Sequence, residues 1–585
     1  MENNFAQELE KDKTQEAKGF FDSIEIKGLS SKRARAVSAG RLGRILKIIS
    51  RLLAYTPARV YGLATLTFGI LTLFLHLGEY YFMDDPEVAV SSLAIGAAFC
   101  VISIFLIISD KPIAIALQSV RLIDFIVFDF FSIGRMQARD GEKKLNPVFG
   151  IMFGALLSLF GFVFPTEYAA LAIIIMVFSV VAMVSPEFPY IFSLLVFPYL
   201  SLLPYHSYVL AVIIIISIIS FIRKVLMGKR MYALEIYDFL LLFLIFSVVL
   251  TGVIFGGKES TETSLLIIVF ILSYIPASNV ALNRRLFDCI ASAIVVSSIP
   301  VSVYSITKYI INIATEKHEP VSAFFKSPSI LAAFLSVSVI ISLYLSAKRS
   351  RASRKRYYFM AFILSSLAII TTEYFAIIST LLVVVFAFAV IRSSRIPRFA
   401  VVLLLIAPFL LFLLPASMLS WLSEAFGIYP TLSELWEGVK SSAALFFNNI
   451  FLGIGANRYG EGGYSLSNTY LALACRFGIL AVLVFFITLV VRIIHLSVHE
   501  KYFSDSTVGF YADICTLASV AMLSLGSFFD IFEDVTMIYF FISVFATGSS
   551  ALRVSKRERE ERLSYYKDAG SSDYAAIDVR IRRKR

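Results

Sequence analysis

The sequence predicts an all-α, polytopic integral membrane protein with about sixteen membrane-spanning helices, in a range of about 14–16. Of its 585 residues, 58% are hydrophobic and only 16% are charged, and its mean hydropathy is +0.80. This composition excludes an ordinary soluble domain. Apolar runs of about 17 to 22 residues recur along the chain, and a helix needs this length to cross a bilayer. The runs are continuously apolar, whereas the strands of a membrane barrel alternate apolar and polar residues.

Charged or proline-containing segments separate the apolar runs and give the order of the expected spans. The stretch 165–206 is the hardest to divide, because it contains several prolines and proline ends or kinks a helix. The spans are expected at 60–78, 88–108, 147–164, 168–184, 188–203, 207–222, 236–255, 263–280, 288–308, 329–346, 357–371, 374–391, 399–417, 468–491, 509–526 and 533–550.

The distribution of Lys and Arg between successive loops predicts that both termini are cytoplasmic. Loops such as 312–327 and 418–467 are acidic or poor in basic residues, whereas the alternate loops, which include Arg223–Arg230 and Lys348–Arg356, are basic. This alternation continues to the basic C-terminal tail. An odd number of spans would have broken it.

The chain is therefore expected to have three parts. Residues 1–57 form a cytoplasmic tail whose basic amphipathic segment, Lys32–Leu53, lies on the inner leaflet as an interfacial helix. Residues 58–551 form the multi-pass domain, with 418–467 as a large extracytoplasmic loop, and 552–585 form a basic cytoplasmic tail. The polar ends of the chain, about 1–25 and 556–585, are expected to be disordered.

The net charge of +11 is explained by the basic cytoplasmic loops and by attraction to anionic inner-leaflet lipid. Nucleic acid is therefore not expected as a partner. The four cysteines show no metal-ligand spacing, and the chain has no phosphate-binding loop of a nucleotide-binding protein. The sequence predicts neither a metal nor a cofactor.

Two polar segments near the C-terminus stand out from this apolar background. Asn448–Gly455 is rich in Asn and Gly, and Tyr464–Leu471 leads directly into an apolar helix. A polar, glycine-rich segment beside a membrane helix must lie at the water interface or line a cavity, so a functional site is expected here. The preceding part of the loop has Trp421, Phe426 and Trp436 among acidic residues, which predicts at least one short interfacial helix.

The C-terminal third, about residues 320–490, resembles the O-antigen ligase and Wzy-type polymerase superfamily of bacterial cell-surface glycan enzymes. Asn449–Gly455 is similar to the family's Asn-Pro-x-x-Gly-x-Gly loop, with Ile450 at the proline. Ser467–Leu471 is similar to its His-Asn-x-Tyr-Leu segment, and Phe477–Leu480 to the glycine-rich helix start that follows. Lys326–Ala332 resembles an Asn-Pro-Asn-x-x-Ala helix start.

The resemblance implies a polymerase or ligase in the bacterial cytoplasmic membrane. Such an enzyme moves a glycan from an undecaprenyl-diphosphate-linked oligosaccharide to a glycan or lipid acceptor at the extracytoplasmic face. The lipid diphosphate is already an activated leaving group, so the implied transferase is metal-independent. Cations must hold the diphosphate, and a base or hydrogen-bond acceptor must orient the attacking hydroxyl.

Candidate residues for these tasks are taken from the expected outer face. For the catalytic role they are Glu461, Glu373 and Asn468. For substrate binding they are Arg458, Arg476, Gly453, Gly455, Lys326 and His318. A structural alternative remains open for each of them. Arg476 can form an ion pair with Glu373 or Asp530, and Asn468 can cap its helix. The two glycines can form a plain tight turn, and the other candidates can be solvated surface residues.

The sequence departs from the family pattern where the chemistry is usually carried. Ser467 occupies the family's histidine position, no arginine occurs near 371–375, and Arg476 replaces a common acidic residue. Two other interpretations are therefore kept beside the enzyme: a transporter or flippase of lipid-linked saccharides, and a non-catalytic scaffold of the same pathway. Few charges are expected in mid-helix, and the polar residues concentrate in 418–467, which favours the enzyme.

Overall fold

A computed structural model describes most of the predicted membrane domain, as two compact units. Unit 1 comprises 1–26, 190–218 and 231–585, and unit 2 comprises 27–189 and 219–230. Apart from isolated positions, the described residues are 24–26, 55–82, 86–119, 145–163, 185–203, 205–226, 232–254, 257–282, 284–316, 319–348, 352–372, 432–456, 468–498 and 508–568.

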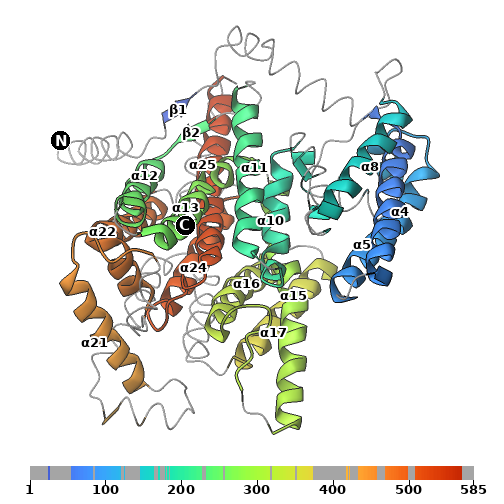
Figure 1. Cartoon of the computed structure of the whole chain (residues 1–585). Coiled ribbons are helices and arrows are strands. Elements are labelled where there is room, and N and C mark those ends of the chain that lie inside the picture. Colours follow the sequence, from blue (N-terminus) through green and yellow to red (C-terminus); the bar gives the residue numbers. More distant parts are fainter. Residues whose placement is uncertain are drawn as a thin grey trace, which may run out of the picture. The chain divides into compact units, whose positions relative to one another are not determined.

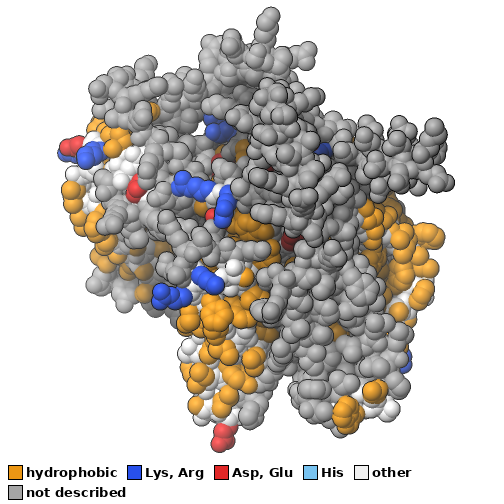
Figure 2. Space-filling view, turned by 180° about the vertical axis from the view of Figure 1, so that it is seen from behind, with side chains coloured by type: hydrophobic (Ala, Val, Ile, Leu, Met, Phe, Trp, Pro, Cys, Tyr) orange, Lys and Arg blue, Asp and Glu red, His pale blue; other side chains and the backbone are white. Residues whose placement is uncertain are grey.

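The described residues confirm a helical protein of membrane type. Nine of their helices are long and apolar enough to cross a membrane, and three shorter ones are also apolar. Large apolar side chains lie on the surface of these helices; Phe74, for example, is 74% exposed. Figure 2 shows hydrophobic side chains over much of the described surface, with charged side chains at only a few positions. A surface of exposed apolar side chains is suited to contact with the hydrocarbon core of a bilayer.

Unit 2 is built on α4, which packs against α5 and α8 through small residues (Figure 1). A Cβ on Gly154 of α8 would lie 2.2 Å from the carbonyl oxygen of Ala64, and one on Gly69 would lie 2.6 Å from Cys100 Sγ. Glycine thus permits the close backbone approach typical of membrane helices. The helices of this unit are α4 (Ala58–Phe82), α5 (Pro86–Ile107), α6 (Ile113–Ser119) and α8 (Pro147–Val163).

Unit 1 is centred on α16, α24 and α25. Helix α24 packs against both of the others, and α16, α24 and residues 536–552 of α25 are almost fully buried. Its elements are β1 (Ile24–Ile26), β2 (Tyr232–Leu234), α12 (Ile236–Val248), the π-helix η2 (Val249–Ile254), α13 (Gly257–Leu272), α14 (Tyr274–Val280), α15 (Arg284–Ala314), α16 (Pro328–Lys348), α17 (Ala352–Ile370), α21 (Leu432–Asn448), α22 (Thr469–Val498), α24 (Gly509–Leu525) and α25 (Thr536–Asp568). The helices α10 (Glu187–Leu200) and α11 (His206–Leu226) contribute residues to both units. Strands β1 and β2 pair antiparallel, Ile24 opposite Leu234.

The helices correspond to the expected spans wherever these are described, but some differ in form. The span expected at 236–255 ends in the π-helix η2, and that at 263–280 is divided at Ser273 into α13 and α14. The expected disorder from about 556 is wrong as far as Asp568, because α25 continues to that residue. Oppositely charged residues four apart, such as Lys556 and Glu560, suit an exposed helix there. The expected spans 374–391 and 399–417, most of 168–184, and the segment Lys32–Leu53 lie outside the described residues.

Candidate functional site

Helix α22 is broken at Gly478, whose backbone has φ 76° and ψ −178°. Only glycine adopts these angles readily. The break leaves carbonyl and N–H groups of the helix without their usual helical partners, and the segment 449–456 supplies them. The amides of Ile454 and Gly455 donate to the carbonyls of Cys475 and Arg476, at 2.8 and 3.1 Å, and the amide of Ile479 donates to the carbonyl of Ile450 at 2.8 Å.

The glycines at this junction allow two backbones to touch. A Cβ on Gly478 would lie 2.1 Å from the carbonyl oxygen of Phe451, and one on Gly453, at φ +66°, would lie 2.6 Å from that of Arg476. The amide of Gly453 donates to the carbonyl of Asn449 at 3.0 Å. The N–H groups of Gly453 and Gly455, both candidates for substrate binding, therefore donate to backbone carbonyls within the protein, as does the N–H of Ile454.

The π-helix η2 and the start of α13 lie on the same junction. Ser247 Oγ, at the end of α12, donates to the carbonyl of Phe477 at 3.1 Å. Ser260 Oγ accepts from the amide of Ala456 at 2.8 Å. π-Helical turns are rare and frequent at functional sites. We call the assembly of Gly478, segment 449–456 and η2 the α22 break.

Two turns into α22, Arg476 forms a buried ion pair with Asp530. Its Nη2 lies 2.6 Å from Asp530 Oδ2, and its Nη1 donates to the carbonyl of Phe532 at 3.0 Å. Burial raises the pKa of the Asp530 carboxyl above its usual range, and the Arg476 guanidinium opposes this rise. Asp530 is one of the two partners considered from the sequence, and the other, Glu373, lies outside the described residues. A diphosphate could reach this guanidinium only if the pair opened, because the Arg476 side chain is 9% exposed.

Asp530 belongs to the connection between α24 and α25, residues 526–535, which we call the 526–535 loop. Thr469, the first residue of α22, binds this loop through two side-chain hydrogen bonds. Its Oγ1 accepts from the amide of Ile531 at 3.0 Å and donates to the carbonyl of Phe529 at 3.1 Å. Its amide donates to the carbonyl of Gly526 at 2.7 Å. The loop is thus fixed to the start of α22.

The same loop contacts Lys326, which lies two residues before α16. Lys326 Nζ lies 2.6 Å from Glu533 Oε1, and the two side chains are 61% and 48% exposed. Of the two candidate cations that the structure describes, Lys326 is exposed to solvent and Arg476 is buried. Glu533 is not among the candidates from the sequence, because the expected span 533–550 includes it. Asp530 lies in the preceding connection, which is expected outside.

Asn468 caps α22, as considered from the sequence. Its Oδ1 accepts from the amide of Leu471 at 2.8 Å, and the residue is buried. A short helix in the expected outer loop is also confirmed: α21 carries Trp436, with Lys440 Nζ 5.7 Å from the centre of its ring. The other candidates, Arg458, Glu461, Glu373 and His318, lie outside the described residues, so their roles stay predictions.

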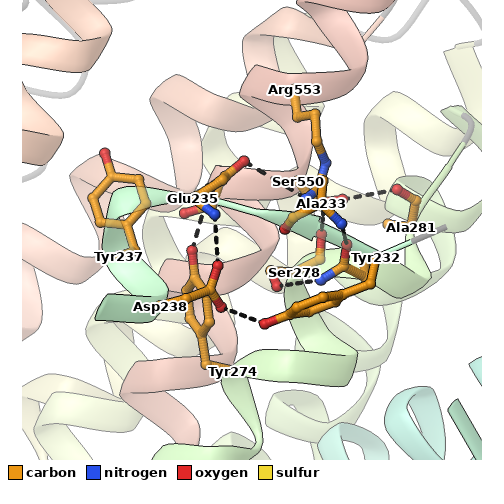
Figure 3. A network of polar contacts seen from close by, with 12 residues as sticks. Tyr232, Ala233, Glu235, Tyr237, Asp238, Tyr274, Ser278, Ala281, Ser550 and Arg553 are labelled. Carbon is orange, nitrogen blue, oxygen red and sulfur yellow. Dashed lines mark hydrogen bonds and ion pairs between the residues drawn. The ribbon is translucent and has the colours of Figure 1, made fainter. Parts of the chain in front are cut away.

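A second group of polar residues, from β2, α12, α14 and α25, forms a network inside unit 1 (Figure 3). Arg553 of α25 reaches Glu235 at 3.6 Å and donates to the carbonyl of Ser278. Glu235 accepts from Tyr274 at 3.4 Å. Burial raises the pKa of Glu235 above its usual range, and Arg553 opposes the rise. These contacts join the start of α12, α14 and α25.

Arg492, one residue beyond the expected span 468–491, is buried inside unit 1. Its Nε and Nη1 donate to Thr516 and Ser549 at 3.2 and 3.0 Å. Its guanidinium lies 5.2 Å from the ring centre of Phe545. The signal was present in the sequence, because apolar residues continue beyond Arg492 at Ile493 and Ile494.

Among the described residues, no group of three or more His, Cys, Asp or Glu side chains is placed to hold a metal ion. Comparison of the chain with family models and with curated proteins found no match.

Proposed function

We propose that the protein is a membrane glycan polymerase or ligase. It would transfer a glycan from an undecaprenyl-diphosphate carrier to a glycan or lipid acceptor at the extracytoplasmic face of the bacterial cytoplasmic membrane. The reaction needs neither a metal nor a cofactor, because the diphosphate is already an activated leaving group. The partners are the lipid-linked oligosaccharide, the acceptor and, at the basic end, anionic inner-leaflet lipid.

The observation that carries this proposal is the convergence of the three sequence segments that resemble the glycan polymerases and ligases. Segment 449–455 pairs with 475–479 through backbone hydrogen bonds. The 526–535 loop binds Thr469 and Arg476 on one side and Lys326 on the other. Segments more than a hundred residues apart thus come together at one end of unit 1, as a shared site requires.

The contacts between connections support the expected grouping of the helix ends into two sides. The amide of Val321, in a connection expected outside, donates at 3.2 Å to the carbonyl of Thr371, the last residue before another such connection. Tyr511 donates to Asp288, and both lie near connections expected inside. We propose about sixteen spans, cytoplasmic termini, and an outward-facing end that carries Lys326 and Asn468.

The proposal is tested in cells whose own copy is deleted and replaced by variants. Deletion should abolish the surface glycan and cause its lipid-linked precursor to accumulate on the outer leaflet. Periodate, which oxidises exposed vicinal diols without crossing the membrane in short exposures, should modify this precursor in intact cells. Unchanged surface glycan in the deletion strain would refute the proposal.

One observation favours a transporter of the same lipid-linked saccharides as a second candidate. A discontinuous helix such as α22, next to buried arginines, is a common arrangement in transporters. Deletion would then leave the precursor on the inner leaflet, protected from periodate until the cells are permeabilised. The same experiment therefore separates the two functions.

A further inference from the structure

The 526–535 loop carries three acidic residues, and they have different surroundings. Asp530 is buried against Arg476. Asp534 is also buried, and its Oδ1 accepts from the amide and hydroxyl of Thr536 at 2.9 and 2.7 Å, which caps α25. Glu533 is about half exposed, and its contact is with the exposed Lys326. A large ligand can therefore compete for the partner of Glu533 without opening the core.

The backbone at Glu533 and the backbone next to Lys326 are both fixed by contacts with the rest of unit 1. The amide of Glu533 donates to the carbonyl of Asp530, and the loop around it is fixed by Thr469 and Arg476. Next to Lys326, Phe325 is buried between the rings of Phe197 and Phe334, with centroid distances of 6.2 and 5.2 Å. An ordinary surface ion pair joins two mobile side chains. Here both backbones are fixed, which is what a reacting group needs.

We propose that Glu533 is the base of the glycan transfer and that Lys326 holds the diphosphate; this inference rests on the proposed function. In the resting protein the ammonium of Lys326 pairs with Glu533. When the lipid diphosphate binds, its oxygens replace Glu533 as the partner of the Lys326 ammonium. The Glu533 carboxylate is then available to the acceptor hydroxyl. The ion pair thus keeps the base occupied until the donor substrate is in place.

The chemical step balances with these groups. The acceptor hydroxyl oxygen attacks the anomeric carbon and forms the new glycosidic bond, while its proton passes to the Glu533 carboxylate. The bond between the anomeric carbon and the diphosphate oxygen breaks, and the diphosphate leaves with the electron pair. Lys326 stabilises the charge that develops on this leaving group. Release of the lipid diphosphate and loss of the proton to water restore the pair.

Substitutions of Lys326 and of Glu533 should differ in their effect on binding of the lipid diphosphate. If the pair were only structural, both substitutions would have the same effect. Undecaprenyl diphosphate is added to the purified full-length protein in nanodiscs, and binding is measured by native mass spectrometry. Lys326→Ala should weaken binding about tenfold, because a charge-assisted contact is lost. Glu533→Gln should bind as tightly as the wild type or more tightly, because it removes the competitor for Lys326.

Transfer is measured in cells as surface glycan and as accumulated lipid-linked precursor. Glu533→Gln should lower transfer about 100-fold or more, the usual range for loss of a general base. Glu533→Asp should recover part of it. Glu319→Gln, a change at another exposed carboxylate of the connection before α16, is the matched control and should change neither binding nor transfer. Membrane abundance of each variant is measured in parallel.

The outcomes separate the inference from the proposed function. If the wild type supports transfer and Glu533→Gln transfers equally well, Glu533 is not the base, while the glycan function stands. If Glu533→Gln and Lys326→Ala weaken binding alike, the exchange of partners is wrong. If deletion of the protein leaves the surface glycan unchanged, the function fails and the inference fails with it.

Discussion

Arg476 and Asp530 are 54 residues apart in the chain and form a buried ion pair, with 2.6 Å between Nη2 and Oδ2. The pair fixes the first half of α22 to the 526–535 loop. It also neutralises the guanidinium before any ligand arrives, so Lys326 becomes the more accessible of the two described cations at this end. A buried charge whose partner is removed is costly, and this makes the pair a sensitive test of the structure.

Arg476→Ala or Asp530→Ala alone should destabilise the protein by about 3–5 kcal/mol, because each leaves one charge buried without its partner. The double variant Arg476→Ala/Asp530→Ala should be less destabilised than the sum of the two single changes, because neither charge is then left without its partner. Thermal unfolding of the detergent-solubilised protein measures this. Strictly additive effects would contradict a direct pair.

Gly478→Ala should prevent segment 449–456 from docking on α22. The added Cβ would meet the carbonyl oxygen of Phe451 at 2.1 Å, and the backbone angles would be strained by about 1–3 kcal/mol as well. The readout is melting temperature together with protease sensitivity of the segment. Gly78→Ala is the matched control, because a Cβ there has no neighbour within 4 Å. Equal behaviour of the two variants would exclude the break as described.

Gly548→Ala should be destabilising because its Cβ would lie 2.2 Å from Arg492 Nη2. Overpacking of this kind costs about 1–3 kcal/mol. The cost should fall when Arg492 is replaced by Met, which removes the guanidinium that the added methyl group would displace. Melting temperatures of the two single variants and the double variant give the coupling. An unchanged cost in the Arg492→Met background would mean that Arg492 lies elsewhere.

Asn468 can be tested for a role beyond capping. Asn468→Ala should cost about 1 kcal/mol, and Asn468→Ser or Asn468→Asp should largely keep the cap and the stability. If Asn468 also orients a sugar hydroxyl, the Ser and Asp variants should keep normal abundance but lose surface glycan. Full activity of both would limit Asn468 to its cap.

Sidedness is tested by a single cysteine at Gly460, in the expected outer loop. In a background where the native cysteines are replaced, this residue should react with a membrane-impermeant maleimide in intact cells. Of the native thiols, Cys289, Cys475 and Cys515 are buried and suit replacement by Ala or Ser. Reaction only after permeabilisation would invert the orientation and move the candidate site to the cytoplasmic side.

Much of the fold follows from local properties of the sequence. Continuous apolar runs predict helices such as α16 and α24 because every backbone group in lipid must be satisfied within its own segment. The cap at Asn468 and the helix in 418–467 were predictable for a similar reason, since both depend on a few neighbouring residues. The sequence predicted disorder from about residue 556, whereas α25 extends to Asp568. A polar composition alone does not distinguish an exposed helix from a disordered tail.

The partners of the polar groups were decided by the tertiary structure. The sequence offered Arg476 two carboxylates, Glu373 and Asp530, and only the packing of α22 against α24 and α25 selects Asp530. The contact of Lys326 with Glu533, and the docking of segment 449–456 on the break at Gly478, likewise join residues distant in the chain. Hydropathy measures how one segment interacts with lipid, so it predicts where a helix lies but not which other helices it contacts. Ion pairs and broken helices depend on which segments meet, and that is determined by packing between helices.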